Sequence, residues 1–105
     1  MPLRITFTAE AEKDVDDAID FVSMDNPTAA GGLAERIEKS LRLLAERPYL
    51  GRQAPETGQR GMRRMAVPPY VVFYFVGQQA VQVVRVLHGA RQLEDRKLYR
   101  EKDAE

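Results

Sequence analysis

Arginines and tyrosines are the residues of this chain whose types and spacing could do chemistry. Arg63 and Arg64 precede a long apolar run, and Arg91 and Tyr99 follow the last apolar run. A guanidinium binds phosphate or carboxylate through its planar fork, but with a pKa above about 12 it is a poor general base. These residues therefore predict a surface that holds an anionic group, without an evident base for proton transfer.

His88 is the only histidine, and its ordinary pKa near neutrality makes it the obvious candidate for acid–base work. The alternative is a structural role, in which His88 closes the core face begun by Val84 and Val86 and hydrogen-bonds into the following turn. Tyr70 and Tyr74 share a face with other apolar residues of their strand. We expect them to pack in the core, with their hydroxyls reaching its rim.

Acidic residues gather on the first predicted helix, where they could form a metal site. Asp14, Asp16, Asp17 and Asp20 fall around the side expected to be solvated, without the alternating oxygen ligands of a calcium loop. The chain has no cysteine and one histidine, which excludes a structural zinc site and a thiol nucleophile. We therefore expect no metal and no other cofactor, and we expect these four carboxylates to be solvated.

The formal net charge of the chain is zero, but the charge is unevenly distributed. Residues 1–46 carry a net charge of −5, whereas residues 47–92 carry a net charge of +6 and contain arginine but no lysine. Two interpretations stay open. The arginine-rich half could meet nucleic acid or an acidic protein, or its arginines could pair with the acidic helices of the same molecule.

Two long apolar runs predict the centre of a β-sheet. Tyr70–Val76 and Val81–His88 are rich in β-branched and aromatic residues, and the short connection between them contains glycine, which is typical of a hairpin. Shorter strands are predicted at Arg4–Phe7 and near Met62–Val67. Both faces of Tyr70–Val76 carry apolar side chains, so both faces of the sheet need cover.

Helical periodicity predicts two helices before the central strands. The first covers Ala9–Met24, and the second begins at Asn26-Pro27 and ends before Pro48. Residues 48–61 have no periodicity and predict a long loop. With so short a connection, the two helices should form an antiparallel hairpin.

The length and the order of elements indicate one domain, residues 1–105, of the α+β class. An α-helical hairpin packs on one face of a mainly antiparallel sheet of four strands, and residues 93–105 add a short C-terminal helical segment. The other face stays partly open and exposes an apolar patch, which predicts a partner that covers it. The patch comprises Val71, Phe73 and Phe75, or their neighbours Val83 and Leu87.

No part of the chain predicts a membrane location. No run approaches the roughly 18 apolar residues of a membrane span, and the N-terminal residues lead straight into a strand. The absence of cysteine fits a reducing compartment. We expect a cytoplasmic protein without a membrane partner.

The segment Val86–Arg91, VLHGAR, resembles the signature that ends the last strand of ParE toxins, in the RelE/ParE superfamily of type II toxin-antitoxin systems. The resemblance covers nearly the whole chain, in short segments of matching order and spacing. These segments are Ala11–Asp14, Ile19–Val22, Asp25–Pro27 with Ala29-Ala30, Ala45–Arg52, Pro55-Glu56 and Tyr70–Tyr74. The family fold that the resemblance implies, a RelE/ParE-like helical hairpin laid across a mainly antiparallel sheet, agrees with the predicted order of elements. The signature keeps the histidine in members that do not look like enzymes, which favours the structural role for His88.

The superfamily divides in its chemistry, and the sequence bears on the division. RelE-like members are ribosome-dependent mRNA endonucleases in which an arginine follows the tyrosine that opens the central strand, whereas Val71 follows Tyr70 here. ParE-like members look like non-enzymatic poisons of DNA gyrase from plasmid-stabilising systems, and the missing arginine favours that branch. The alternative is an endoribonuclease whose catalytic residues would be Arg63, Arg64, Arg91 and Tyr99.

The resemblance also implies two protein partners. A ParD-like antitoxin, whose C-terminal segment wraps its toxin as it folds, would form a hetero-oligomer with this chain. Its expected contacts are Arg63, Arg64, Val71, Phe73, Phe75 and Arg85. The contact with gyrase is expected from Arg91 through Tyr99 to Arg100, because this stretch is least needed to build the core. We expect no sequence-specific DNA binding by this chain.

Overall fold

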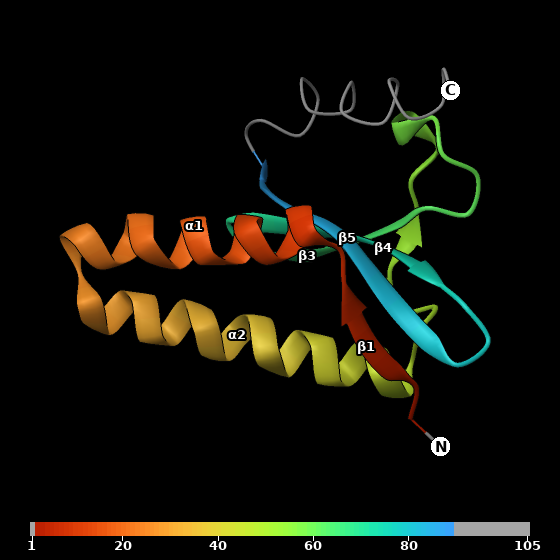
Figure 1. Ribbon diagram of the computed structural model, residues 1–105, viewed down its shortest axis with the longest axis horizontal. Coiled ribbons are helices and arrows are strands. Elements are labelled where there is room, and N and C mark those ends of the chain that lie inside the picture. The colour runs from red at the N-terminus through yellow and green to blue at the C-terminus, as the bar shows by residue number, and fades with distance from the viewer. Residues whose placement is uncertain (1, 90–105) are drawn as a thin grey trace.

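A computed structural model describes residues 2–89 of the protein, and Met1 and residues 90–105 lie outside the described part. The described residues fold into two helices and a five-stranded sheet, the α+β class that the sequence predicts (Figure 1). The elements are β1 (Arg4–Phe7), α1 (Ala9–Asp25), α2 (Pro27–Glu46), β2 (Arg52–Gln53), the 3-10 turn η1 (Pro55–Thr57), β3 (Arg63–Val67), β4 (Tyr70–Val76) and β5 (Ala80–His88). The helical segment predicted at residues 93–105 lies outside the described residues.

The strands lie in the order β1-β5-β4-β3-β2. β1 runs parallel to β5, and the other neighbouring strands are antiparallel, so the prediction of a mainly antiparallel sheet is confirmed. The prediction of four strands misses β2, where Arg52 pairs with Arg64 and Gln53 with Arg63. A strand of two residues has no periodicity to detect, and it forms only because β3 lies beside it.

A single residue separates the two helices. Asn26 ends α1 with its backbone N–H bonded to the Val22 carbonyl, and its side-chain oxygen accepts a hydrogen bond from the Ala29 N–H at the start of α2. Pro27 occupies the first turn of α2, where its missing N–H costs nothing. The helices therefore fold back as the antiparallel hairpin seen in Figure 1. Neither described helix has the length and apolar character needed to cross a lipid bilayer.

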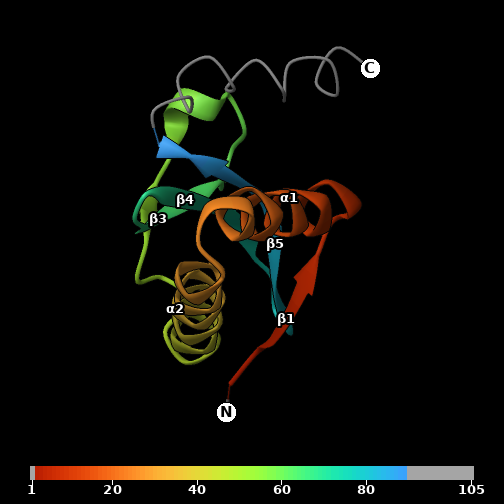
Figure 2. The ribbon, with the colours of Figure 1, turned by 90° about the vertical axis from the view of Figure 1, so that its left-hand side faces the viewer.

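The helical hairpin covers one face of the sheet. Ile37 and Leu41 of α2 are buried in one core cluster with the β4 and β5 side chains Val72, Tyr74 and Val81, and Ile19 of α1 packs against it. Figure 2, which looks along the helices, shows both of them on the side of the sheet away from η1. The prediction that the helices cover one face is therefore confirmed.

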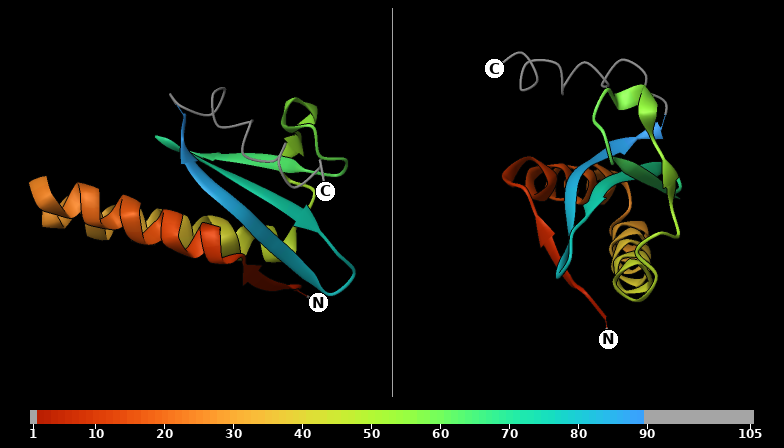
Figure 3. Two further views of the ribbon diagram at one scale, coloured as in Figure 1. Left: turned by 45° about the horizontal axis from the view of Figure 1, so that its top comes forward. Right: turned by 90° about the vertical axis from the view of Figure 1, so that its right-hand side faces the viewer.

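The second face of the sheet is covered as well. Ala54 and Met62, which flank η1, form a second core cluster with Val71, Phe73, Val84 and Leu87, and Phe75 packs against it. A hydrogen bond of 2.8 Å from the Ala54 N–H to the Met62 carbonyl closes this segment, which lies over β3 and β4 in Figure 3. The expectation of an exposed patch at Val71, Phe73 and Leu87 is therefore wrong, because the loop expected at residues 48–61 folds back over these side chains.

A bulge in β5 changes which side chains share a face. Phe73 pairs with Arg85 and Tyr74 with Val83, so Val84 is an extra residue in the ladder. Val83 consequently belongs to the core under the helices, and Val84 belongs to the second cluster. The expectation that Val83 and Leu87 share the open face is therefore wrong, because Val83 lies on the helix-covered face, apart from Leu87.

Candidate functional site

Arg63 and Arg64 point to opposite faces of the sheet. Arg63 pairs with Tyr74, whose side chain lies in the core under the helices, and Arg64 pairs with Phe73, whose side chain lies in the second cluster. Successive side chains of a strand alternate between faces, which separates the two guanidinium groups. The structure therefore does not bring together the two arginines that a shared phosphate clamp would use.

Arg63 holds the turn that follows α2. Its Nε and Nη2 atoms donate to the Gly51 carbonyl at 3.0 and 2.6 Å, and Nη2 also lies 3.3 Å from the Tyr49 carbonyl. Its guanidinium lies 5.2 Å from the centre of the Tyr49 ring, within range of a cation–π contact. Arg63 is thus engaged inside the molecule on the helix-covered side.

Arg64 belongs to a row of side chains that crosses the second face. The pairing of the strands places Arg52, Arg64, Phe73 and Arg85 side by side on β2, β3, β4 and β5. Arg64 donates to Glu56 at 2.9 Å, and its guanidinium lies 5.5 Å from the centre of the Phe73 ring. Three of the predicted site residues, Arg64, Phe73 and Arg85, are therefore brought together.

Glu56 provides the local counter-charge for this row. Its carboxylate lies 3.7 Å from Arg52 and 2.9 Å from Arg64. Partial burial of Glu56 opposes its ionisation, but the hydrogen bond from Arg64 and the positive charges of both arginines outweigh it, so the pKa of Glu56 lies below its ordinary value. Glu56 is therefore ionised at neutral pH.

Arg85 forms the most extensive ion pair of the described chain. Its Nε and Nη2 atoms donate to the two carboxylate oxygens of Asp14 at 2.7 and 2.9 Å, and the Val86 N–H donates to Asp14 at 2.9 Å. Both side chains are at least four-fifths buried, with 18% and 13% exposure for Arg85 and Asp14. Asp14 thereby occupies the edge of β5 just beyond the end of β1. The expectation that Asp14 is solvated is wrong.

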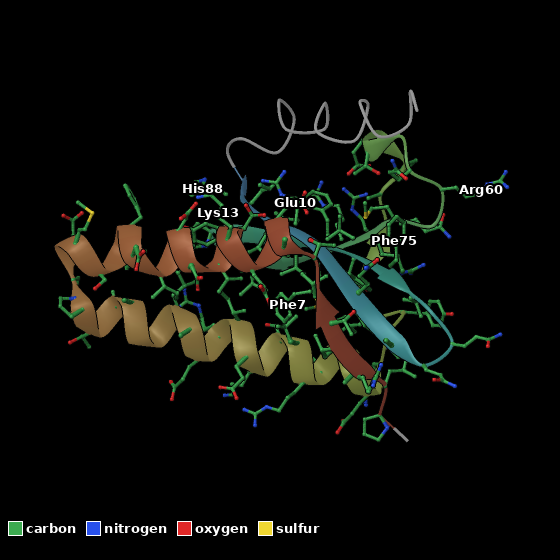
Figure 4. All side chains as sticks on the ribbon, viewed as in Figure 1. Phe7, Glu10, Lys13, Arg60, Phe75 and His88 are labelled. Atoms are coloured by element: carbon green, nitrogen blue, oxygen red, sulfur yellow. The ribbon has the colours of Figure 1, made fainter. Side chains whose placement is uncertain are left out.

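The remaining predicted site residues differ in exposure. Val71 and Phe73 are buried, and Phe75 is partly exposed. Figure 4 shows Phe75 near the segment that carries Arg60, whereas His88 lies toward the other end of the sheet beside α1. His88 is exposed, and its ring centre lies 5.4 Å from that of Tyr70 with the two ring planes nearly perpendicular, so the expectation that it closes the core is wrong. Arg91, Tyr99 and Arg100 lie outside the described residues.

The described residues offer little for metal or small-molecule chemistry. Within residues 2–89, no group of three or more histidine, aspartate or glutamate side chains could hold a metal ion. An open groove of about 370 Å³ lies beside α1 and is lined by Phe7, Glu12, Val15 and Asp16. Its two carboxylates disfavour a phosphate ligand.

Two structural roles were missed by the sequence reasoning. Tyr74 packs in the core as expected, but the sequence did not indicate that its hydroxyl accepts from the Gly51 N–H at 2.9 Å and donates to the Pro48 carbonyl at 3.0 Å. Asp14 was grouped with its exposed neighbours, although it pairs with Arg85, 71 residues away. The sequence signal that could have indicated this pair was the uneven charge of the two halves of the chain. The interpretation that the arginines pair with the acidic helices of the same molecule is confirmed for Arg85.

Comparisons with known proteins place the chain among bacterial toxins. A family profile described as the ParE toxin of the type II toxin-antitoxin system parDE matches residues 5–93. The toxin RelE2 of Caulobacter vibrioides is 35% identical over 89 residues, which are 84% of this chain and 97% of that protein.

Solved structures show the same fold at lower identity. A chain of the chromosomal ParDE toxin-antitoxin system of P. aeruginosa matches with a TM-score of 0.69 and 19% identity, over 82% of this chain and 95% of that one. A chain of the toxin-antitoxin complex RelBE2 of Mycobacterium tuberculosis matches with a TM-score of 0.56 and 19% identity, over 84% of this chain and 99% of that one. At this identity the likeness concerns the fold alone.

Proposed function

Because this chain belongs to the ParE toxin family of type II toxin-antitoxin systems, we propose that it inhibits DNA gyrase by binding it and is neutralised by a cognate antitoxin. The observation that carries the proposal is the separation of Arg63 and Arg64 onto opposite faces of the sheet. A nuclease must gather a base, an acid and a charge-stabilising group around one phosphodiester. An inhibitor that acts by binding needs only a surface.

The environment of Val71 supports the same reading. The side chain is buried beside Phe73 and Leu87 in the second cluster. RelE-like enzymes, the other branch of the superfamily, have an arginine at this place, and an arginine here would put an unpaired charge into an apolar cluster. The valine therefore fits a toxin whose action does not require phosphate stabilisation at this position.

The proposed antitoxin contacts centre on the second face. Phe75 is partly exposed there, and Arg64 and Arg85 retain 16% and 18% of their side-chain exposure. Carboxylates of an antitoxin segment would join or replace Glu56 and Asp14 as partners of these arginines. Val71 and Phe73 would support the contact from beneath, and Arg63 would act through the turn that it holds.

The proposed gyrase contact runs from Arg91 through Tyr99 to Arg100. The experiment that tests it compares the full chain with a variant that ends at residue 92. We expect the shortened protein to lose inhibition of gyrase supercoiling and to keep most of its affinity for the antitoxin. Equal inhibition by both proteins would place the gyrase contact elsewhere.

The second candidate function is that of a ribosome-dependent endoribonuclease. The observation that favours it is the name RelE2 of the relative that is 35% identical to this chain. Its catalytic residues would be Arg63, Arg64, Arg91 and Tyr99. This candidate requires Arg63 or Arg64 to act alone, because the two side chains lie on different faces.

A further inference from the structure

The solvent-facing side of α2 is divided into two flanks of different charge. Arg36, Leu43 and Arg47 recur at helical spacing along one flank, and all three are exposed. Arg36 donates to the Pro68 carbonyl at 3.3 Å, which shows that this flank faces the turn between β3 and β4. The opposite flank is mainly acidic and carries the exposed residues Glu35, Glu38, Arg42 and Glu46, and the exposed Lys39 lies between the two flanks.

Exposed apolar side chains gather at the end of the arginine flank. Leu43 is 43% exposed, Tyr49 67% and Leu50 46%. Only two other large hydrophobic side chains of the described chain are comparably exposed, Phe21 and Met24, and both belong to α1. Large apolar side chains that gather in this way on a soluble protein mark a contact site.

The backbone around these side chains is held in place. The Arg47 N–H donates to the Leu43 carbonyl at 2.8 Å, and the Leu50 N–H donates to the Arg47 carbonyl at 3.0 Å. Arg63 bonds the Tyr49 carbonyl and lies over the Tyr49 ring. A surface that is already ordered loses less conformational entropy when a partner binds.

We infer that Arg36, Leu43, Arg47, Tyr49 and Leu50, the α2-end surface, bind an acidic amphipathic helix of the antitoxin. Arg36 and Arg47 form no ion pair within residues 2–89, so carboxylates of a partner can form ion pairs with them. The two arginines are separated by about 16 Å along α2, or about three helical turns. The partner helix should therefore carry carboxylates about three turns apart, with apolar residues between them that pack on Leu43 and Leu50.

The chemistry of this surface fits a protein partner better than a nucleic acid. Exposed leucines gain little from a phosphate backbone, whereas they pack well against the apolar stripe of a helix. The inference rests on the antitoxin half of the proposed function and is independent of the toxin's target.

The test is titration calorimetry of the full chain with its purified cognate antitoxin. Arg36→Glu and Arg47→Glu are each expected to raise the dissociation constant at least about tenfold, because they place like charges against the carboxylates of the helix. The matched control is Arg42→Glu, which makes the same change on the opposite flank and should alter the constant less than about twofold. An equal rise of the dissociation constant in all three variants, or an unchanged constant in all three, would overturn the inference.

Two further readouts separate this surface from its alternatives. The variants should keep the wild-type melting temperature and wild-type inhibition of the target in the absence of antitoxin. If they lose target inhibition while antitoxin affinity is unchanged, or if Leu43→Ser dissolves a homodimer in sedimentation, the surface serves another partner and the inference is wrong. Failure of the wild-type protein to bind any antitoxin would overturn the proposed function together with this inference.

Discussion

The hydroxyl of Tyr74 lies 2.9 Å from the Gly51 nitrogen, whose N–H donates to it, and the same hydroxyl donates to the Pro48 carbonyl. The Tyr74 ring is fully buried in the core under the helices. One side chain thus fills the core and fixes the turn after α2. From that turn the chain continues into β2 and η1, so the position of Glu56 on the second face depends on a contact made on the first.

Removal of the Tyr74 hydroxyl should loosen this turn. Tyr74→Phe is expected to lower the free energy of unfolding by about 1–3 kcal/mol, because the Gly51 N–H and the Pro48 carbonyl lose a buried partner. Urea denaturation followed by circular dichroism measures the change. The matched control is Tyr49→Phe, at a ring that is 67% exposed, and it should stay within about 0.5 kcal/mol of wild type. An equal loss in both variants would contradict the role given to Tyr74.

Gly51 is required because of its close neighbours. A Cβ at this position would collide with the Arg64 carbonyl oxygen and the Tyr74 hydroxyl, whereas a Cβ at Gly31 would meet no heavy atom within 4 Å. We expect Gly51→Ala to destabilise the protein by about 1–3 kcal/mol. Gly31→Ala, in the interior of α2, should stabilise it by about 0.5–1 kcal/mol. Differential scanning calorimetry compares the two, and a Gly51→Ala variant as stable as wild type would contradict the packing described.

The ion pair of Asp14 with Arg85 should contribute to stability. Asp14→Asn keeps an acceptor for the Val86 N–H but removes the charge that Arg85 meets through two hydrogen bonds. We expect a loss of about 1–3 kcal/mol in the free energy of unfolding. Asp16→Asn, at an exposed position of the same helix, is the control and should change stability by less than about 0.5 kcal/mol. Indistinguishable unfolding curves for the two variants would argue against this pair.

Glu56 gives the stability a defined pH dependence. Its folded-state pKa is lowered below the ordinary value of 4.5, so its contribution is fully present above that value and is lost as the pH falls through the lowered pKa. We expect Glu56→Gln to be less stable than wild type at pH 7 and to approach wild-type stability as the pH falls well below 4.5. Urea unfolding of both proteins across this range measures the difference. A difference that grows on acidification would contradict the assigned direction.

Periodicity in the sequence was sufficient for the regular elements. The apolar run Tyr70–Val76 became β4 with the predicted bounds, and the cap at Asn26 with Pro27 began α2 as expected. Alternation along a strand also implied that Arg63 and Arg64 face apart, but the two were grouped by charge. The fold could therefore be predicted closely. The opposite orientation of Arg63 and Arg64 could also have been predicted from the same alternation.

Contacts between distant residues could not be predicted from local patterns. The bulge at Val84 depends on how β4 and β5 pair, and the cover over the second face depends on Arg63, Gly51 and Tyr74 holding one turn. Asp14 resembles its exposed neighbours in sequence until β5 brings Arg85 against it. For this reason Val71, Phe73 and Leu87 of the predicted apolar patch are buried in the folded chain.

We propose that this toxin acts on gyrase by binding and does not cleave RNA. The direct measurement adds the purified full chain to gyrase with relaxed plasmid and, in parallel, to ribosomes programmed with mRNA. We expect supercoiling to stop, added antitoxin to restore it, and the mRNA to remain intact. Codon-specific cleavage of the ribosome-bound mRNA, lost in Arg91→Ala and accompanied by normal supercoiling, would contradict the proposed action on gyrase.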